Sequence, residues 1–281
     1  MSPQSPNYQK VAEAVCKNLK LSIVSYRGAG RYKEVYCVGL NSFLYALKII
    51  IEPSRRTTRE IDAIRKCNHP NIARLFDFGT IRHSNRDFDY LLEEYLGEGS
   101  LSSLLTRGLI PTAQSSNIGR QLTSALGHLD DLRLVHRDIK PDNIMFKNNF
   151  DTPVLVDFGI VRDLSRFSLT DTSAMPGPCT PYFSSPEQLI NEKNMINWRS
   201  DQFSLGVVLC FSSLGFHPYQ HDSEGAFSSD TVMRVRERGT RNRRILGLLE
   251  GTEISCVERM TRPWPVERYL KPGDLENAWG S

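Results

Sequence analysis

Residues 136–143, His-Arg-Asp-Ile-Lys-Pro-Asp-Asn, place two carboxylates, a lysine and an amide in one short segment near the middle of the chain. An apolar run follows soon afterwards and ends in Asp157-Phe158-Gly159. A carboxylate such as Asp138 can accept the proton of a hydroxyl group, while Asn143 and Asp157 offer oxygen ligands for a divalent metal. Together these side chains are typical of phosphoryl transfer, so the fold must bring both segments to one place.

The sequence between the two segments predicts a strand, a turn and a second strand. Ile144–Phe146 and Val154–Val156 are apolar, and a polar turn is expected at Lys147–Asp151. A hairpin returns the chain to the edge where it started, so we expect Asn143 and Asp157 to lie close together. That convergence is required if both are to bind one metal ion.

These residues resemble the catalytic loop and metal-binding segment of the eukaryotic-like, or Hanks-type, serine/threonine protein kinases. The resemblance implies that Asp138 orients the substrate hydroxyl as the catalytic base, and that Lys140 neutralises charge on the migrating phosphoryl group. It also implies that ATP is the donor and that Asn143 and Asp157 hold Mg²⁺, with Mn²⁺ as an alternative. Lysine at position 140 is typical of the serine/threonine branch rather than of the tyrosine kinases.

The resemblance covers residues 21 to about 272, so the chain is interpreted as a minimal catalytic domain. It implies an α+β, two-lobed protein-kinase-like fold. The N-lobe, residues 21–96, is expected to be a small antiparallel sheet with one main helix, and the C-lobe, residues 97–281, to be larger and mainly helical. Residues 1–20 form an N-terminal extension in which apolar residues from Val11 onwards recur at helical spacing. We favour packing of this short helix against the N-lobe over a regulatory docking role.

Two glycines, Gly28 and Gly30, lie between strand-like runs. This spacing permits a tight turn whose main-chain N–H groups approach phosphate oxygens. The glycine-rich loop of kinases has a third glycine where Lys33 stands in this chain. Two alternatives therefore remain for Lys33, which is either a helper in phosphate binding or an exposed side chain.

Lys48 lies in the middle of an apolar strand-like run, where a buried charge needs an anionic partner. The resemblance implies that Lys48 holds the α- and β-phosphates of ATP and that Val35 and Ala46 form the roof over adenine. Its expected ion-pair partner is Glu60, which follows Lys48 by only twelve positions, a short separation for this family. Asp62 is the alternative partner.

The segment Glu93-Glu94-Tyr95-Leu96 resembles the hinge between the kinase lobes. The resemblance implies that Glu94 and Leu96, together with Met145 from the larger lobe, contact the nucleotide. Glu93 occupies the gatekeeper position at the back of the adenine pocket, which is commonly apolar. A carboxylate there should alter which inhibitors fit, and it would allow a salt link to an inner lysine.

A segment rich in hydroxyl groups follows residue 159 and resembles an activation loop. We expect autophosphorylation at Thr170, Thr172 or Ser173. Arg137, beside the catalytic aspartate, suggests control by such a phosphate, because a guanidinium and a phosphate pair strongly.

The resemblance implies supporting roles for four residues downstream. Thr180 would hydrogen-bond toward Asp138 and the lysine two residues beyond it. Asp201 precedes a strongly apolar helix, so its carboxylate would be buried and must find donors, and in kinases it holds the backbone of the catalytic loop. Glu187 would form a structural ion pair with Arg268.

Composition and termini favour a cytoplasmic protein. The chain has 281 residues, a net charge of +3 and a pI near 8.5, so a nucleic-acid partner is not required. Its six cysteines contain no Cys-x-x-Cys pair, which fits reduced thiols better than disulfides or zinc. No secretory signal pattern opens the chain, and the longest apolar run, residues 204–216, is too short to span a bilayer. We therefore expect no membrane partner.

Six arginines gather between positions 234 and 244: Arg234, Arg236, Arg238, Arg241, Arg243 and Arg244. This cluster is interpreted either as a solvated helix face or as a docking site for an acidic partner. Aromatic residues do not interleave with it, which argues against binding of single-stranded nucleic acid.

Two rival functions belong to other classes: a non-catalytic scaffold, and an enzyme that phosphorylates a small metabolite or antibiotic. The intact set of Lys48, Asp138, Asn143 and Asp157 argues against the scaffold. The segment 180–187 resembles a platform for protein substrates and argues against the metabolite enzyme. The physiological substrate and the oligomeric state do not follow from the sequence.

Overall fold

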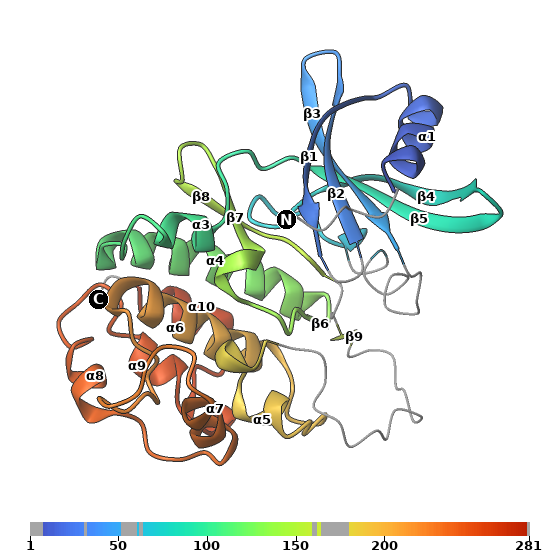
Figure 1. Cartoon of the computed structure of the whole chain (residues 1–281). Coiled ribbons are helices and arrows are strands. Elements are labelled where there is room, and N and C mark those ends of the chain that lie inside the picture. Colours follow the sequence, from blue (N-terminus) through green and yellow to red (C-terminus); the bar gives the residue numbers. More distant parts are fainter. Residues whose placement is uncertain are drawn as a thin grey trace. The chain divides into compact units, whose positions relative to one another are not determined.

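The computed structural model describes residues 8–30, 33–51, 61, 64–158, 162–163 and 180–279. The chain divides into two compact units (Figure 1). The N-terminal unit comprises residues 1–68 and 73–97, and the C-terminal unit comprises residues 69–72 and 98–281. The first contains a five-stranded sheet and the second is mainly helical, which confirms the expected α+β fold class.

The sheet of the N-terminal unit is antiparallel throughout, with the strand order β1-β2-β3-β5-β4. Its strands are β1 (Ser22–Ala29), β2 (Lys33–Leu40), β3 (Phe43–Ile50), β4 (Leu75–His83) and β5 (Arg86–Glu94). Two-residue turns join β2 to β3 and β4 to β5. Asn41 in the first turn and both Ser84 and Asn85 in the second have positive φ, the backbone conformation that tight hairpins require.

Helix α1 (Gln9–Leu19) packs on one face of this sheet. Val11 and Val15 of the helix are buried against alternate residues of the strands, among them Tyr36 and Leu47. Successive side chains of a strand point to opposite faces, so the neighbours of these core residues belong to the other face. The packing interpretation of the N-terminal helix is therefore correct, and the second face of the sheet remains for a site.

The C-terminal unit is built around two long helices that pack together, α4 (Thr112–Asp131) and α6 (Trp198–Leu214) (Figure 1). The shorter helices are α3 (Leu101–Leu105), α5 (Pro186–Leu189), α7 (Ser229–Arg236), α8 (Arg243–Gly247), α9 (Val257–Met260) and α10 (Pro272–Glu276). Short 3-10 turns cover Pro141–Asn143, Pro181–Phe183 and Pro265–Glu267. Helix α6 is buried nearly all round, as the apolar run in its second half predicts.

The end of the chain is locked onto α4 by one tryptophan. A Cβ atom added to Gly119 would lie 2.3 Å from the ring of Trp279, so only glycine permits this approach. The indole N–H of Trp279 donates a hydrogen bond of 2.9 Å to the hydroxyl of Thr123, which lies one turn further along the same helix.

Two small hairpins carry the segments predicted to hold the chemistry. Strand β7 (Ile144–Lys147) pairs with β8 (Thr152–Leu155), so that Ile144 lies opposite Leu155. Strand β6 (Leu134–Val135) pairs with β9 (Arg162–Asp163). The predicted strand–turn–strand unit is therefore present, and its turn contains three consecutive residues with positive φ, at positions 148–150.

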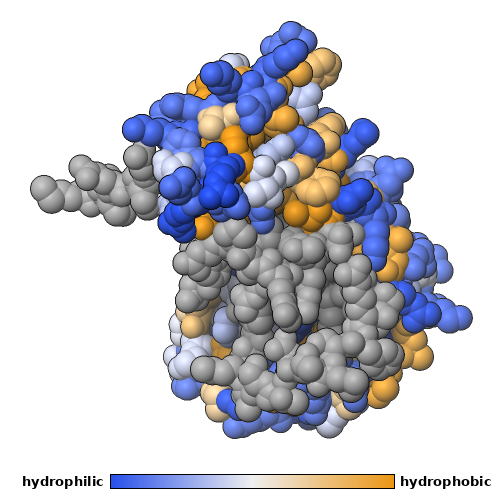
Figure 2. Space-filling view, turned by 90° about the vertical axis from the view of Figure 1, so that its right-hand side faces the viewer, coloured by the Kyte–Doolittle hydropathy of each residue, from blue (hydrophilic) through white to orange (hydrophobic). Residues whose placement is uncertain are grey.

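The N-terminal unit exposes several large apolar residues. Phe43 and Val24 are 68% and 57% exposed, and hydrophobic residues lie among hydrophilic ones on the described face of this unit (Figure 2). Scattered residues of this kind are ordinary on protein surfaces. No helix in the described part of the chain is both long enough and apolar enough to cross a membrane.

Candidate active site

The catalytic-loop segment is fixed by a buried carboxylate on α6. Asp201 accepts hydrogen bonds from the main-chain N–H groups of His136 and Arg137, at 2.7 and 2.8 Å. Arg137 has a φ of 71°, a conformation that is unfavourable for a residue with a side chain and needs such support. Burial raises the pKa of Asp201, while the two N–H donors and His136 act in the opposite direction. The contact expected for Asp201 is therefore present.

The imidazole of His136 connects this loop to the strand that leads to Asp157. Its Nδ1 atom accepts the N–H of Asp138 at 3.3 Å, so its Nε2–H is the group that donates to the carbonyl of Val156 at 3.2 Å. The ring also packs edge-on against Phe158, with centroids 4.8 Å apart. The motif was recognised from the sequence, but this role of its first residue was not.

Asp138 lies at the centre of a polar cluster in the C-terminal unit. Its Oδ1 atom accepts hydrogen bonds from both the N–H and the hydroxyl of Thr180, at 3.2 and 3.0 Å. Its Oδ2 atom accepts one from the amide of Asn143 at 3.0 Å and lies 2.8 Å from the ammonium of Lys140. Lys140 also donates to the hydroxyl of Thr180 at 2.9 Å. The fold thus brings together four residues that the sequence singles out, and it holds the carboxylate of Asp138 in one orientation.

Asn143 and Asp157 fit a site for a hard divalent cation. Both N–H bonds of the Asn143 amide point to Asp138, one to its carbonyl at 2.8 Å and one to its carboxylate, so the amide oxygen faces away. The carbonyl of Asn143 accepts the N–H of Val156 at 3.0 Å, which brings the residue before Asp157 beside Asn143. Among the described residues no three acids, histidines or cysteines gather as a metal cage. One amide oxygen and one carboxylate suit Mg²⁺, which keeps waters and takes phosphate oxygens as further ligands.

Gln188 supports the loop from α5, and the sequence reasoning missed it. Its amide N–H donates to the carbonyl of Arg137 at 2.8 Å, and its amide oxygen accepts both the N–H and the hydroxyl of Ser185. Ser185 and Gln188 form a capping box at the start of α5. A serine followed three residues later by glutamine is a signal that could have identified the cap, but not its contact with the loop.

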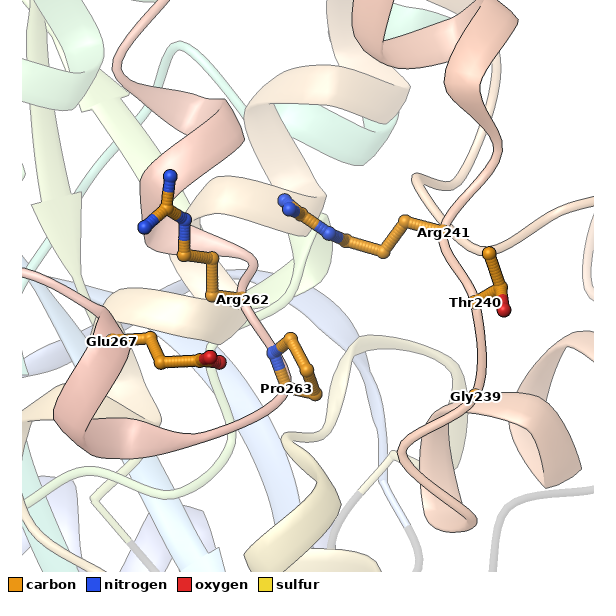
Figure 3. Close-up of a pocket in the computed structure, with 6 residues that line it drawn as sticks. All are labelled: Gly239, Thr240, Arg241, Arg262, Pro263 and Glu267. Atoms are coloured by element: carbon orange, nitrogen blue, oxygen red, sulfur yellow. The ribbon is translucent and has the colours of Figure 1, made fainter.

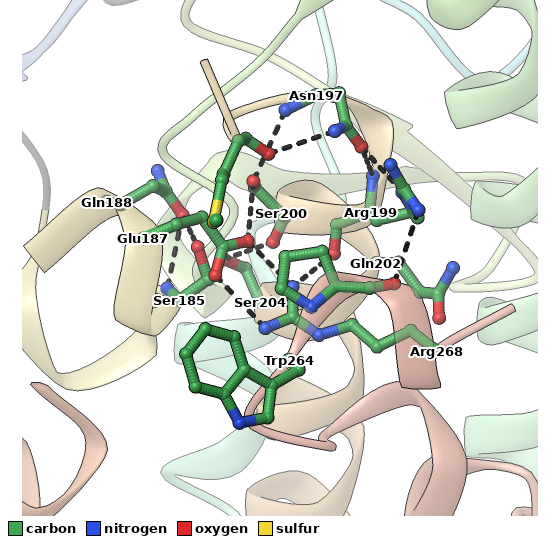
Figure 4. A network of polar contacts seen from close by, with 12 residues as sticks. Ser185, Glu187, Gln188, Asn197, Arg199, Ser200, Gln202, Ser204, Trp264 and Arg268 are labelled. Atoms are coloured by element: carbon green, nitrogen blue, oxygen red, sulfur yellow. Dashed lines mark hydrogen bonds and ion pairs between the residues drawn. The ribbon is translucent and has the colours of Figure 1, made fainter. Parts of the chain in front are cut away.

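Glu187 and Arg268 form the expected ion pair, and Figure 4 shows the network around them. Arg268 donates to both carboxylate oxygens of Glu187, at 2.7 and 3.1 Å, and the hydroxyl of Ser200 donates to the same carboxylate at 2.7 Å. Although burial opposes it, the pKa of Glu187 is lowered by the charge and hydrogen bonds of Arg268 and by Ser200. The pair anchors α5 to the segment after α9 and is structural.

On the N-terminal unit, Lys48 lies on the sheet face opposite α1. The strand register places Lys48 beside Val35 of β2, and Ala46, two residues earlier, beside Glu93 of β5. The ammonium of Lys48 lies 2.6 Å from the carboxylate of Glu93, and the two side chains are 9% and 3% exposed. The salt link that a carboxylate at position 93 allows is therefore present.

The remaining expected nucleotide contacts have ordinary local geometry. Gly28 has a φ of 139°, which favours glycine, and the N–H of Gly30 donates to the carbonyl of Lys33 at 2.8 Å to close the turn. Glu94 ends β5 and Leu96 is buried after it. In the C-terminal unit, Met145 lies on β7 and is partly buried.

Several predicted residues lie outside the described residues, namely Glu60, its alternative Asp62, and the expected phosphorylation sites Thr170, Thr172 and Ser173. Their roles stay predictions.

The arginine cluster is largely neutralised within its own unit. Four of its six members form ion pairs: Arg234 with Glu224, Arg238 with Glu192, Arg241 with Glu258, and Arg244 with Asp222. A pocket of about 360 Å³ beside it is lined by Gly239, Thr240, Arg241, Arg262, Pro263 and Glu267 (Figure 3). The two arginines of that pocket share the carboxylate of Glu258. This pairing favours a structural role for most of the cluster. Arg236 and Arg243 are exposed, and neither forms an ion pair among the described residues.

The antiparallel sheet with its buried lysine, and the helical unit with the Asp138 cluster, define the class of protein kinase catalytic domains. A model of the protein kinase domain matches residues 22–256, which is most of the chain. The chain therefore belongs to the protein kinase family.

The chain is similar to several serine/threonine kinases. It is 28% identical over 264 residues to a probable serine/threonine-protein kinase of Clostridium perfringens, covering 89% of this chain and 37% of that protein. It is 30% identical over 223 residues to serine/threonine-protein kinase PrkC of Bacillus subtilis, covering 79% and 33%. It is 28% identical over 209 residues to calcium/calmodulin-dependent protein kinase type 1 of Caenorhabditis elegans, covering 70% and 57%. The chain thus spans only about a third of the length of the two bacterial relatives.

Proposed function

We propose that this chain is a serine/threonine protein kinase that transfers the γ-phosphoryl group of ATP to hydroxyl groups of proteins. Membership of the protein kinase family and the names of its relatives support the reaction class. The observation that carries the proposal is the fixed carboxylate of Asp138, held by Asn143, Lys140 and Thr180.

In this reaction Asp138 accepts a hydrogen bond from the substrate hydroxyl and orients it toward the γ-phosphorus. Its basicity need not be high, because phosphoryl transfer depends mainly on positioning and charge stabilisation. The substrate hydroxyl would approach the carboxylate of Asp138 beside the Thr180 hydroxyl, which keeps its hydrogen bond to Oδ1. Lys140, 2.8 Å from the same carboxylate, then lies near enough to stabilise charge on the migrating group.

Each unit contributes its own nucleotide-binding residues. Lys48 would hold the α- and β-phosphates, with main-chain N–H groups of the Gly28–Gly30 turn and Lys33 beside them. Adenine would contact Val35, Ala46, Glu94, Leu96 and Met145. Asn143 and Asp157 would hold Mg²⁺ or Mn²⁺, which when bound neutralises phosphate charge.

We further propose activation by autophosphorylation in the loop that contains Thr170, Thr172 and Ser173, with Arg137 as the partner of the phosphate.

We also propose that the protein acts in the cytoplasm. This location is supported by the four buried cysteines Cys16, Cys37, Cys210 and Cys256, which form no disulfide.

A protein substrate is favoured over a small metabolite by the segment after Thr180. Thr180 contacts Asp138 directly, and the helix α5 that follows is held by the buried Glu187–Arg268 pair and by Gln188. A rigid surface beside the catalytic carboxylate suits an extended peptide better than an enclosed small molecule.

The test is a transfer assay with labelled ATP, using the protein itself, a generic basic protein and a panel of small acceptors. Asp138→Ala should lose transfer while nucleotide binding, measured by titration, survives. Asp142→Asn changes an exposed carboxylate in the same loop, so it is the matched control and should stay active.

Lys48→Ala should also abolish transfer, whereas a larger loss with Lys33→Ala would reverse the lysine roles. Near-normal turnover of Asp138→Ala would overturn the assignment of the base, and transfer only to a small acceptor would favour the metabolite enzyme.

A further inference from the structure

The ion pair between Lys48 and Glu93 is the most deeply buried charge pair of the N-terminal unit among its described residues. The atoms are 2.6 Å apart and both side chains are nearly inaccessible to water. A buried charge is costly unless a counter-charge accompanies it, so the carboxylate of Glu93 is stabilised by the ammonium beside it.

The strand register brings the two side chains within reach of each other. Ala46 lies opposite Glu93, and Lys48 lies opposite Leu91, so Lys48 and Glu93 are diagonal neighbours on adjacent strands. Diagonal neighbours on one sheet face lie within reach of long side chains. Neither side chain needs a conformational change of a helix to find the other, because both belong to the same hydrogen-bonded ladder.

The carboxylate of Glu93 relies on Lys48 for its neutralisation. Its Oε2 atom contacts the ammonium, and its Oε1 atom is buried without a hydrogen-bond partner. The other residues on this face near the pair, Val35, Ala46 and Leu91, are apolar. In this environment the charge of Glu93 favours one position of the ammonium.

We infer that Glu93 is a positioning residue for Lys48, which it holds on the sheet face so that the ammonium is oriented for phosphate oxygens before the nucleotide binds. This inference rests on the proposed nucleotide role of Lys48. An ammonium has three N–H groups, so a carboxylate oxygen on one side of it is compatible with a phosphate oxygen on another. Fixing a flexible lysine in advance reduces the entropy lost when the ligand binds.

The opposite effect would be competition, in which Glu93 withholds the ammonium from the phosphates. The two effects predict opposite changes in ATP affinity when the charge at position 93 is removed. Adenosine distinguishes either effect from damage to the fold, because adenosine has no phosphate for Lys48 to bind.

The experiment measures dissociation constants of ATP and adenosine by calorimetric titration for the wild type, Glu93→Gln and Glu93→Asp. Glu93→Gln keeps the shape and removes the charge, and we expect its ATP affinity to fall about tenfold while its adenosine affinity is unchanged. Glu93→Asp keeps the charge on a shorter side chain and should lie between the two. Asp87→Asn is the matched control, because Asp87 lies on the same strand with a side chain that is 59% exposed. It should leave both affinities unchanged.

A double-mutant cycle with Lys48→Met tests whether the effect passes through the lysine. In the Lys48→Met background, adding Glu93→Gln should not change the ATP affinity further. Unchanged or tighter ATP binding by Glu93→Gln would overturn the inference, and so would an equal loss for adenosine. Phosphoryl transfer by the wild type is assayed in parallel. If it fails while the ATP-specific loss is observed, the proposed reaction is wrong and the positioning role of Glu93 stands.

Discussion

Arg268 and Glu187 lie 81 positions apart in the chain and form an ion pair in which both side chains are completely buried. The guanidinium is fully satisfied, since its remaining N–H groups donate to the carbonyls of Arg262, Arg199 and Pro263. Such a pair connects distant segments, and its stability depends on both partners being present.

Replacing Arg268 by methionine should destabilise the C-terminal unit severely. The substitution leaves the carboxylate of Glu187 buried without its counter-charge and removes donors from three carbonyl groups. Breaking a buried pair in this way costs about 3–5 kcal/mol. The measurement is the midpoint of unfolding in urea, monitored by circular dichroism.

Arg244→Met provides the control for this prediction. Arg244 pairs with Asp222 at the surface, where the side chains are 51% and 60% exposed. A surface pair of this kind is screened by water and contributes little to stability, so the midpoint should barely move. Equal shifts in the urea midpoint for the two variants would show that the buried pair contributes no more to stability than the surface pair.

The hydroxyl of Thr180 should matter for transfer because it links Asp138 and Lys140. Thr180→Val has nearly the same shape but removes the donor to Asp138 and the acceptor for Lys140. We expect kcat to fall at least about tenfold, equivalent to about 1.4 kcal/mol. Thr180→Ser retains the hydroxyl and should keep most of the activity. Steady-state assays at saturating ATP compare the two, and a Thr180→Val rate as high as that of Thr180→Ser would show that the hydroxyl does not contribute to transfer.

Acid should destabilise the C-terminal unit through His217. Burial lowers the pKa of His217 from 6.5 to about 3, and Arg234 acts in the same direction against a hydrogen bond with the backbone of Tyr182. Below pH 6.5 the unfolded chain therefore binds a proton that the folded chain does not, so stability falls as the pH decreases toward 3. The loss between pH 7 and pH 5 should be about 2 kcal/mol from this residue.

Urea unfolding of His217→Asn at pH 7 and pH 5 tests this origin. Asparagine can still offer an acceptor to the N–H of Tyr219, which His217 Nδ1 accepts at 3.0 Å, but it does not titrate. The difference in stability between the two pH values should shrink by about 2 kcal/mol. His221→Asn, at an exposed position, should leave the difference as it is in the wild type. If His217→Asn shows the same difference in stability between pH 7 and pH 5 as the wild type, the acid sensitivity comes from other groups.

Residues that act within short segments were predictable. Asp138, Lys140 and Asn143 lie within six positions of each other, and the hairpin that follows returns Asp157 to them. The helical spacing of the apolar residues from Val11 onwards likewise predicted the helix α1, which packs on the sheet face that carries Tyr36 and Leu47. Local periodicity determines these features.

Contacts between distant segments were harder to predict. Gln188 supports the carbonyl of Arg137 across 51 positions, and nothing near either residue in the sequence indicates the contact. The arginines between 234 and 244 suggested a charged surface, yet Arg234 and Arg241 are bound to acids that the chain brings from elsewhere. Such pairings depend on packing rather than on local pattern.

The sequence by itself indicated the family and predicted the groups proposed to carry the chemistry, because those groups occur in short motifs with fixed spacing. The tertiary structure decided which partners hold them. Lys48 needs a counter-charge in any fold, but only the register of β3 against β5 brings Glu93 to within 2.6 Å of it. A motif specifies residue types along one segment, whereas a buried charge is stabilised by whatever the neighbouring strands place beside it.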